Sequence, residues 1–205
     1  MKKVVFVLFL FLFSCASKNT YFSFPKEEKV VLAVAPCFHP RYGWDMLAGY
    51  IESDKNINTN VLKELDLLIF QTLEKRKVKF IRAEITKQCI ELIKFSKKKS
   101  IFQYWIKVGQ CVPTDFLLIP YIYKYQKREG GEYGVKRPAH VVFDLFLFDI
   151  KKKKLVYRFH FDEAQVSLSE NLLSLGKFFA RKGKWITAKE LFLEGLKVGL
   201  GEIGL

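Results

Sequence analysis

The sequence of 205 residues contains none of the short motifs that mark common catalytic or metal sites. It has no GxSxG or GxxxxGK[ST] pattern, so serine-nucleophile and P-loop chemistry are not supported. Its three histidines lack a His or Cys partner at the HExxH type of spacing, which argues against a zinc site. No CxxC occurs, which argues against thioredoxin-like and zinc-ribbon folds. We therefore expect no catalytic residue, no metal and no cofactor.

The sequence also lacks an apolar run long enough to cross a membrane as a helix. Residues 4–13 form an unbroken apolar run of ten residues, whereas a transmembrane helix needs about 20. Lys2 and Lys3 precede the run and the small Ser14 follows it, which is the pattern of a secretory signal. We therefore predict that residues 1–14 are a signal peptide.

The residues after this run indicate how the chain is anchored. The stretch Leu12-Phe13-Ser14-Cys15 resembles the bacterial lipobox, in which a signal peptidase cuts before the cysteine. The resemblance implies that Cys15 carries the lipids and that residues 15–28 form a tether reaching at most about 45 Å. Ala16 in place of Asp implies the periplasmic face of the outer membrane. The alternative is an ordinary secretory peptide followed by an unrelated cysteine.

Acidic residues are scarce: 21 Asp and Glu oppose 35 Lys and Arg, giving a formal net charge of +14. On a cytosolic protein such a charge would suggest nucleic acid. An exported, membrane-tethered protein rarely meets nucleic acid, so we expect none as a partner. Anionic lipid headgroups or cell-wall polymer are the polyanions within reach, and a solvated lysine-rich surface is the alternative.

Cysteine is also rare, with four residues. Lipidation of Cys15 leaves an odd number in a compartment where disulfides persist. Cys89 and Cys111 bracket a predicted helical segment, so they are the preferred disulfide pair, and Cys37 is then a free, buried thiol. The alternative is that all three are reduced and act as small hydrophobic residues.

Hydrophobic periodicity and turn signals divide the rest of the chain into strands and helices. Two helix starts carry a capping box, Ser167-x-x-Glu170 and Thr187-x-x-Glu190. Residues 126–137 form a polar hairpin loop. The predicted strands are 30–35, 78–82, 115–125, 139–150 and 155–161, and the predicted helices are 61–77, 84–97, 101–108, 172–180 and one that begins at Thr187.

This order of elements predicts an α/β (α+β) fold. Its β-α-β opening indicates parallel pairing with helices packed on the sheet. Four lysines separate the strands 139–150 and 155–161, so these form a tight antiparallel hairpin. Pro120 indicates an edge strand or a bulge, because proline cannot donate to a ladder. We predict one domain, residues 29–205, with a mixed sheet of about five strands and helices on its faces.

The lipobox, the short tether, the first strand VVLAVAPC and the closing order of strands, hairpin and helices resemble two kinds of periplasmic lipoprotein. These are the lipoproteins of curli secretion and the activators of penicillin-binding proteins. The resemblance implies an α/β fold like that of the N-terminal domain of the translocation protein TolB. Residues 137–149, 161–165, 169–172 and 183–190 also resemble an uncharacterised group of bacterial lipoproteins. Neither resemblance implies a catalytic residue.

Residues 37–50 (CFHPRYGWDMLAGY) form the most unusual predicted loop. It brings Phe38, Tyr42 and Trp44 beside Arg41, and these residue types are enriched at the energetic centres of protein interfaces. We therefore predict that these four residues bind a partner. The alternative is a loop that folds its aromatic side chains back onto the core.

Paired carboxylates offer the only acid–base chemistry that the sequence suggests. Asp144 lies in an apolar strand, and Asp162 and Glu163 come before a predicted helix, where negative charge is stabilising. Together with Gln165, the last two can also fix the corner between strand and helix by hydrogen bonds. We favour these structural roles over catalysis.

The sequence thus favours a non-enzymatic, lipid-anchored periplasmic adaptor or assembly component of a cell-envelope complex. The first alternative is an activator of a peptidoglycan synthase, against which the short tether weighs. The second is a cell-wall glycan-binding protein or hydrolase that uses Asp144 or Glu163.

Overall fold

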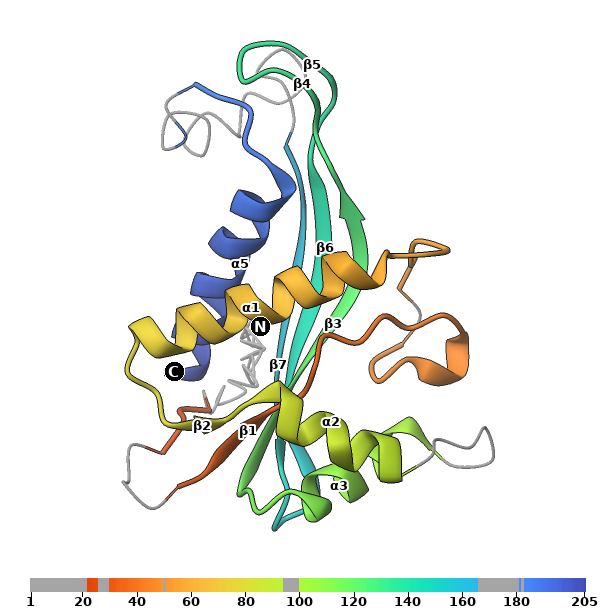
Figure 1. Ribbon diagram of the computed structural model, residues 1–205, viewed down its shortest axis with the longest axis vertical. Helices are drawn as coiled ribbons and strands as arrows, with labels where there is room; N and C mark the ends of the chain where they lie inside the picture. Colours follow the sequence, from red (N-terminus) through yellow and green to blue (C-terminus); the bar gives the residue numbers. More distant parts are fainter. Residues whose placement is uncertain (1–21, 26–29, 50, 94–99, 166–180, 182) are drawn as a thin grey trace, which may run out of the picture.

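The computed structural model describes residues 22–25, 30–49, 51–93, 100–165, 181 and 183–205. Its centre is a five-stranded mixed sheet with the order β2-β1-β3-β6-β7 (Figure 1). β1 pairs in parallel with β2 and β3, while β3, β6 and β7 pair antiparallel. The predicted mixed sheet is confirmed. The strands are β1 (Leu32–Val34), β2 (Phe80–Ile81), β3 (Phe116–Gln126), β6 (His140–Asp149) and β7 (Lys154–Ala164).

Helices cover both faces of the sheet and make two hydrophobic cores. On one face lie α1 (Thr59–Lys75) and α5 (Ala188–Ile203), and on the other lie α2 (Ala83–Leu92) and α3 (Ile101–Cys111) (Figure 1). Successive residues of β6 alternate between the two cores, which is why this strand is apolar almost throughout. Within the described part of the chain, no helix has both the length and the apolar character needed to span a membrane.

The boundaries of several elements differ from the prediction. α2 ends at Leu92, within the predicted helix 84–97, and residues 94–99 lie outside the described residues. The predicted helix 172–180 also lies outside them. The predicted polar loop 126–137 contains a small hairpin of β4 (Glu129–Gly130) and β5 (Val135–Arg137). α5 begins at the predicted capping box, with Thr187 and Glu190 bonded reciprocally.

Pro120 does not mark an edge strand, because β3 lies between β1 and β6. β3 accepts proline because regular pairing with β1 ends at Leu118, so no ladder hydrogen bond from residue 120 is needed on that side. The carbonyl of Pro120 instead accepts the N–H of Phe38 at 2.8 Å. A register shift between β3 and β6 follows at Ile122–Lys124, close to the predicted bulge.

Four residues of the predicted tether, 22–25, are described by the structure, and two of them contact the core. The signal peptide, residues 1–14, and Cys15 lie outside the described residues. Phe22 and Phe24 pack on Phe116, with ring centroids 5.9 and 5.2 Å apart, and the Phe24 N–H donates to the Ile203 carbonyl. Phe22 and Phe24 are therefore packed against the core. Seven residues from Cys15 to Phe22 reach at most about 25 Å.

α5 approaches the sheet closely because glycines face it. A Cβ atom at Gly199 would lie 2.5 Å from Phe159 Cδ1, and one at Gly195 would lie 2.7 Å from the Phe161 ring. Gly201, in the same helix, has nothing nearer than 4.0 Å.

These different surroundings predict that replacing glycine by alanine has opposite effects on the free energy of unfolding at Gly199 and at Gly201. Gly199→Ala should lower the free energy of unfolding by about 1 kcal/mol or more, because overpacking, at about 1–3 kcal/mol, exceeds the gain in helix propensity. Gly201→Ala should raise it by about 1 kcal/mol, since only the propensity changes. Urea unfolding of both variants checks this. If both variants changed the free energy of unfolding in the same direction, the close packing of α5 on the sheet at Gly199 would be contradicted.

Candidate functional site

The predicted binding loop, residues 37–50, is part of the connection that leaves the carboxyl end of β1 at Cys37 and reaches the start of α1 at Thr59; this whole connection is called the loop below. Phe38 fixes its first part. The Phe38 ring lies edge-on to Trp105, with centroids 5.7 Å apart, and 4.9 Å from Tyr121. Its carbonyl accepts the Ile122 N–H at 2.8 Å. Phe38, one of the four predicted partner-binding residues, thus faces the core and positions the loop.

Polar contacts fasten the rest of the loop to β3. The His39 ring, through Nδ1, bonds the Ile122 carbonyl at 2.9 Å. Ser53 Oγ donates to the Tyr123 carbonyl at 3.2 Å, and the Asp54 N–H donates to the same carbonyl at 2.8 Å. These bonds join both arms of the loop to the edge of β3 that β1 leaves uncovered, so the loop is held at its base.

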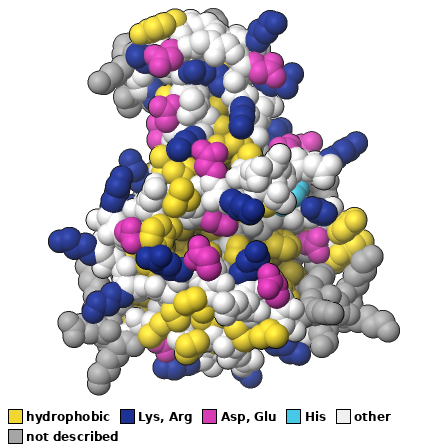
Figure 2. Space-filling model, viewed as in Figure 1, with side chains coloured by type: hydrophobic (Ala, Val, Ile, Leu, Met, Phe, Trp, Pro, Cys, Tyr) yellow, Lys and Arg dark blue, Asp and Glu magenta, His cyan; other side chains and the backbone are white. Residues whose placement is uncertain are grey.

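The tip of the loop presents the other three predicted residues at the surface. Tyr42 and Trp44 stack with ring centroids 4.5 Å apart and planes at 17°, and they are 54% and 45% exposed. Tyr42 directly precedes the one-turn helix η1 (Gly43–Asp45) and Trp44 lies within it; the buried Asp45 of η1 accepts the Arg41 N–H at 3.2 Å. Figure 2 shows hydrophobic side chains on the flank of the molecule where η1 lies in Figure 1. The tip is therefore an exposed aromatic pair beside an exposed arginine.

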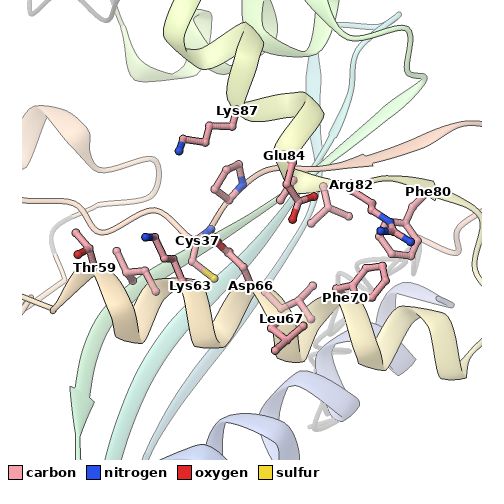
Figure 3. A pocket seen from close by; sticks show the side chains of 15 residues that line it. Cys37, Thr59, Lys63, Asp66, Leu67, Phe70, Phe80, Arg82, Glu84 and Lys87 are labelled. Atoms are coloured by element: carbon pink, nitrogen blue, oxygen red, sulfur yellow. Dashed lines mark hydrogen bonds between the residues drawn. The ribbon is translucent and has the colours of Figure 1, made fainter.

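A cavity of about 520 Å³ lies between α1 and α2, at the carboxyl end of β1 (Figure 3). Parallel strands commonly have their ligand sites at this end. Thr59 and Cys37, the two ends of the loop, both line it. Apolar side chains form most of its walls: Val34, Pro36, Leu62, Leu67, Phe70 and Phe80.

Cys37 and Asp66 meet in the wall of the cavity. The Asp66 carboxylate accepts the Cys37 N–H at 2.6 Å. Burial, and then the negative charge of Asp66, raise the pKa of the Cys37 thiol well above its usual value. The thiol is thus protonated at neutral pH and is a poor nucleophile. Burial also raises the pKa of Asp66, against the opposing effect of the Cys37 N–H.

The raised pKa of Asp66 predicts a pH-dependent effect of Asp66→Asn. The folded chain holds the proton more tightly than the unfolded chain, so stability falls as pH rises from the ordinary value of 3.8 through the raised one. Asparagine carries no charge to desolvate and keeps an oxygen for the Cys37 N–H. We expect the variant to be more stable than the parent above that interval and to lose the advantage below it.

Urea unfolding at several pH values measures the effect of Asp66→Asn. The exposed Glu52→Gln serves as the control and should show no such trend. A difference between Asp66→Asn and the parent that stays constant with pH would contradict the raised pKa.

Charged side chains stand around the mouth of the cavity. Lys63 of α1 and Lys87 of α2 lie at the same end, while Arg82 and Glu84 lie toward the other (Figure 3). Arg82 stacks on the Phe70 ring, with its guanidinium carbon 4.3 Å from the centroid. The mouth is thus basic at the Lys63–Lys87 end, next to the base of the loop.

Asp144 is fully buried, and its oxygens accept three side-chain donors. Tyr123 OH and Arg158 Nε lie 2.9 and 3.0 Å from Oδ2, and His160 Nδ1 lies 2.6 Å from Oδ1. Burial, and then the charge of Asp144, raise the pKa of Tyr123, so its hydroxyl remains a donor. This arrangement favours the predicted structural role of Asp144.

The remaining predicted carboxylates, Asp162 and Glu163, lie in β7, and the helix predicted after them falls outside the described residues. Asp162 pairs with His140 at 2.9 Å, and Glu163 pairs with Arg181 at 2.7 Å. Gln165 joins the end of β7 to the start of α5, because its side chain accepts the Ile186 N–H and donates to the Lys184 carbonyl. Glu163 adds a second link, because Arg181 also donates to Glu194 of α5.

Sequence reasoning missed the cavity and the role of Asp66. The available signal was a carboxylate on the apolar face of α1, four residues after Leu62 and three before Ile69. Among the described residues, no group of three or more His, Cys, Asp and Glu side chains could hold a metal ion.

No family model matches this chain, and no curated protein matches it in sequence. Its structure is similar to the C-terminal domain of LpoB from Salmonella enterica, at 12% identity and a TM-score of 0.40, over 66% of this chain and 83% of that one. It is also similar to the hypothetical protein CT253 from Chlamydia trachomatis, at 19% identity and a TM-score of 0.45, over 85% of this chain and 98% of that one. A third similar structure is that of lipoprotein GNA1162 from Neisseria meningitidis, at 13% identity and a TM-score of 0.43, over 74% of this chain and 92% of that one.

Proposed function

We propose that this chain is a lipid-anchored, non-enzymatic adaptor at the periplasmic face of the outer membrane, where it docks a protein of the cell envelope. The observation that carries the proposal is the stacked Tyr42–Trp44 pair beside Arg41. Two large aromatic rings are held in the solvent on a loop whose base is bonded to the sheet. If the loop only folded its aromatic side chains back onto the core, the rings of Tyr42 and Trp44 would be buried, but they are exposed.

The contact chemistry of the loop tip suits a protein interface. Tyrosine, tryptophan and arginine contribute most of the binding free energy at many interfaces. Stacking and the hydrogen bonds at the loop base restrict these side chains before a partner arrives, which lowers the entropy lost on docking. The loop therefore supports binding without any reacting group.

The short anchor limits which partners the chain reaches. A lipid on Cys15 keeps Phe22, which packs on the core, within about 25 Å of the membrane surface. This distance favours a partner in or near the outer membrane. It weighs against activation of a synthase across the wall. A hydrolase is disfavoured because Asp144 and Glu163 are both engaged by cationic donors.

The proposal is tested by replacing both exposed rings. In cells that express the full-length chain, chemical cross-linking to its envelope partner should fall about tenfold or more in the variant Tyr42→Ala with Trp44→Ala, because interface aromatic residues often contribute 2 kcal/mol or more each. Cys15→Ala should also abolish it by releasing the chain from the membrane.

Tyr133→Ala is the matched control, since Tyr133 is 79% exposed on the distant β4–β5 hairpin. It should leave the cross-link unchanged. Equal recovery of the partner from the parent and from the Tyr42 and Trp44 double variant would refute the proposed docking surface.

A further inference from the structure

The groove between α1 and α2 has the features of a second docking element. Its volume, about 520 Å³, is in the range of sites that accept ligand groups, about 300–1,000 Å³. Leu67, on its α1 wall, is 52% exposed, although it lines an apolar cavity. Figure 2 shows hydrophobic side chains in the band between α1 and α2, with charged side chains beside them. Apolar surface is thus available both inside the groove and on its lip.

The exposed lip favours a protein segment over a small molecule. A small ligand inside the cavity would leave the outer side of Leu67 in water, and partly exposed Phe70 beside it as well. A segment lying along the groove covers the lip and the cavity together, as in other complexes where a chain occupies a groove between helices.

The charged residues at the mouth of the groove determine which charge on that segment is favoured. Lys63 and Lys87 face the groove from opposite helices at one end (Figure 3). Lys87 also pairs with Glu91 at 3.8 Å, but both side chains are more than 60% exposed, so the pair is weak and exchangeable. Among the lining residues, Asp66 accepts the Cys37 N–H and also interacts electrostatically with Lys87, while Glu84 lies toward the other end, so two lysines face one lining carboxylate here. The Lys63–Lys87 end therefore attracts an acidic group.

The groove is continuous with the aromatic loop. Its basic end lies beside Thr59 and Cys37, the two ends of the segment that carries Tyr42 and Trp44 (Figure 3). A partner that contacts the loop tip is thereby placed to extend a segment into the groove.

We propose that this groove binds an apolar segment of the envelope partner, with an acidic residue of that segment held between Lys63 and Lys87. The inference rests on the proposed adaptor function and names the chemistry of the partner. A large apolar side chain of the segment packs on Leu67, Phe70 and Phe80. The acidic residue lies toward the base of the loop, which sets the direction of the segment.

A random dodecapeptide phage library, selected on the lipidated full-length chain in lipid nanodiscs, tests this. We expect enriched peptides to carry a large apolar residue close to Asp or Glu. A synthetic copy of an enriched peptide should bind at least about tenfold more weakly to Leu67→Glu, and also to Lys63→Glu with Lys87→Glu, by calorimetric titration.

Matched controls come from α5. Val198 is also 52% exposed, so Val198→Glu and Lys197→Glu repeat the same chemical changes on another helix. Both should bind within about twofold of the parent. Thermal unfolding of every variant shows that the fold is kept.

Three results would overturn the inference: enrichment of peptides without acidic residues, equal binding to Leu67→Glu, or no enrichment on the parent relative to Leu67→Glu. Binding of dodecanoate that Leu67→Glu abolishes, with no peptide selected, would also overturn it and assign the groove to an amphiphile. If cross-linking to the partner were lost without Tyr42 and Trp44 but unchanged in Leu67→Glu, binding in the groove would be refuted. The proposed adaptor function would still hold.

Discussion

Asp144→Ala is expected to lower the free energy of unfolding by about 3 kcal/mol, because a buried donor left without its acceptor costs about 1–3 kcal/mol, and more where charge is involved. Asp144 is 0% exposed and accepts from Tyr123, Arg158 and His160. Its removal leaves the buried Tyr123 hydroxyl without its acceptor and leaves Arg158 without its counter-charge. The Tyr123 hydroxyl is buried and cannot turn to water, whereas Arg158, whose side chain is 35% exposed, is partly solvated.

Urea unfolding measures this effect, and Asp162→Ala is its control. Asp162 also pairs with a histidine, His140, but its side chain is 55% exposed. The control should cost less than about 1 kcal/mol, as exposed pairs do. Similar losses in the two variants would show that burial of Asp144 has little effect on stability.

Removing the bond between Cys89 and Cys111 is expected to lower the free energy of unfolding by about 3 kcal/mol. The structure joins their sulfur atoms across α2 and α3, with 22 residues of sequence separation. A cross-link over such a loop restricts the unfolded chain, and the loss of that restriction destabilises the folded state by about this amount. At this chain length the midpoint Tm should fall by about 6–12 °C.

Thermal unfolding of the parent with and without reductant measures the effect of this bond. The double variant Cys89→Ala with Cys111→Ala should have a low Tm that reductant does not change further. Cys37 does not interfere, because it is buried and forms no disulfide with another described residue. If reductant did not change the Tm of the parent, the disulfide between Cys89 and Cys111 would be contradicted.

Features encoded by neighbouring residues could be predicted. The capping box at Thr187 and the hairpin turn of four lysines each depend on a few consecutive side chains, and both are present. Leucine and isoleucine spacing likewise indicated α1, because one helix face must be apolar to cover a sheet.

The surroundings of Asp144 depend on a detail that the sequence does not reveal. Asp149 pairs with Lys154 at the hairpin, and a regular ladder from there would place Phe159 opposite Asp144. A bulge between Leu147 and Phe148 shifts the register by one residue and brings His160 there instead. The cavity was equally hidden, because it exists only where β1, α1 and α2 pack together.

The three tryptophans differ in environment, which gives the chain separate optical probes. Trp105 is 1% exposed and donates from Nε1 to Tyr121 OH at 2.7 Å, whereas Trp44 is exposed on the loop tip and Trp185 is half-buried. Trp105 should therefore emit at short wavelength and resist quenching by iodide, while Trp44 should emit at longer wavelength and be quenched readily. The difference in emission between the parent and Trp44→Phe isolates the loop tip, so a partner that covers it should shift and protect that emission while the signal of Trp105 stays constant.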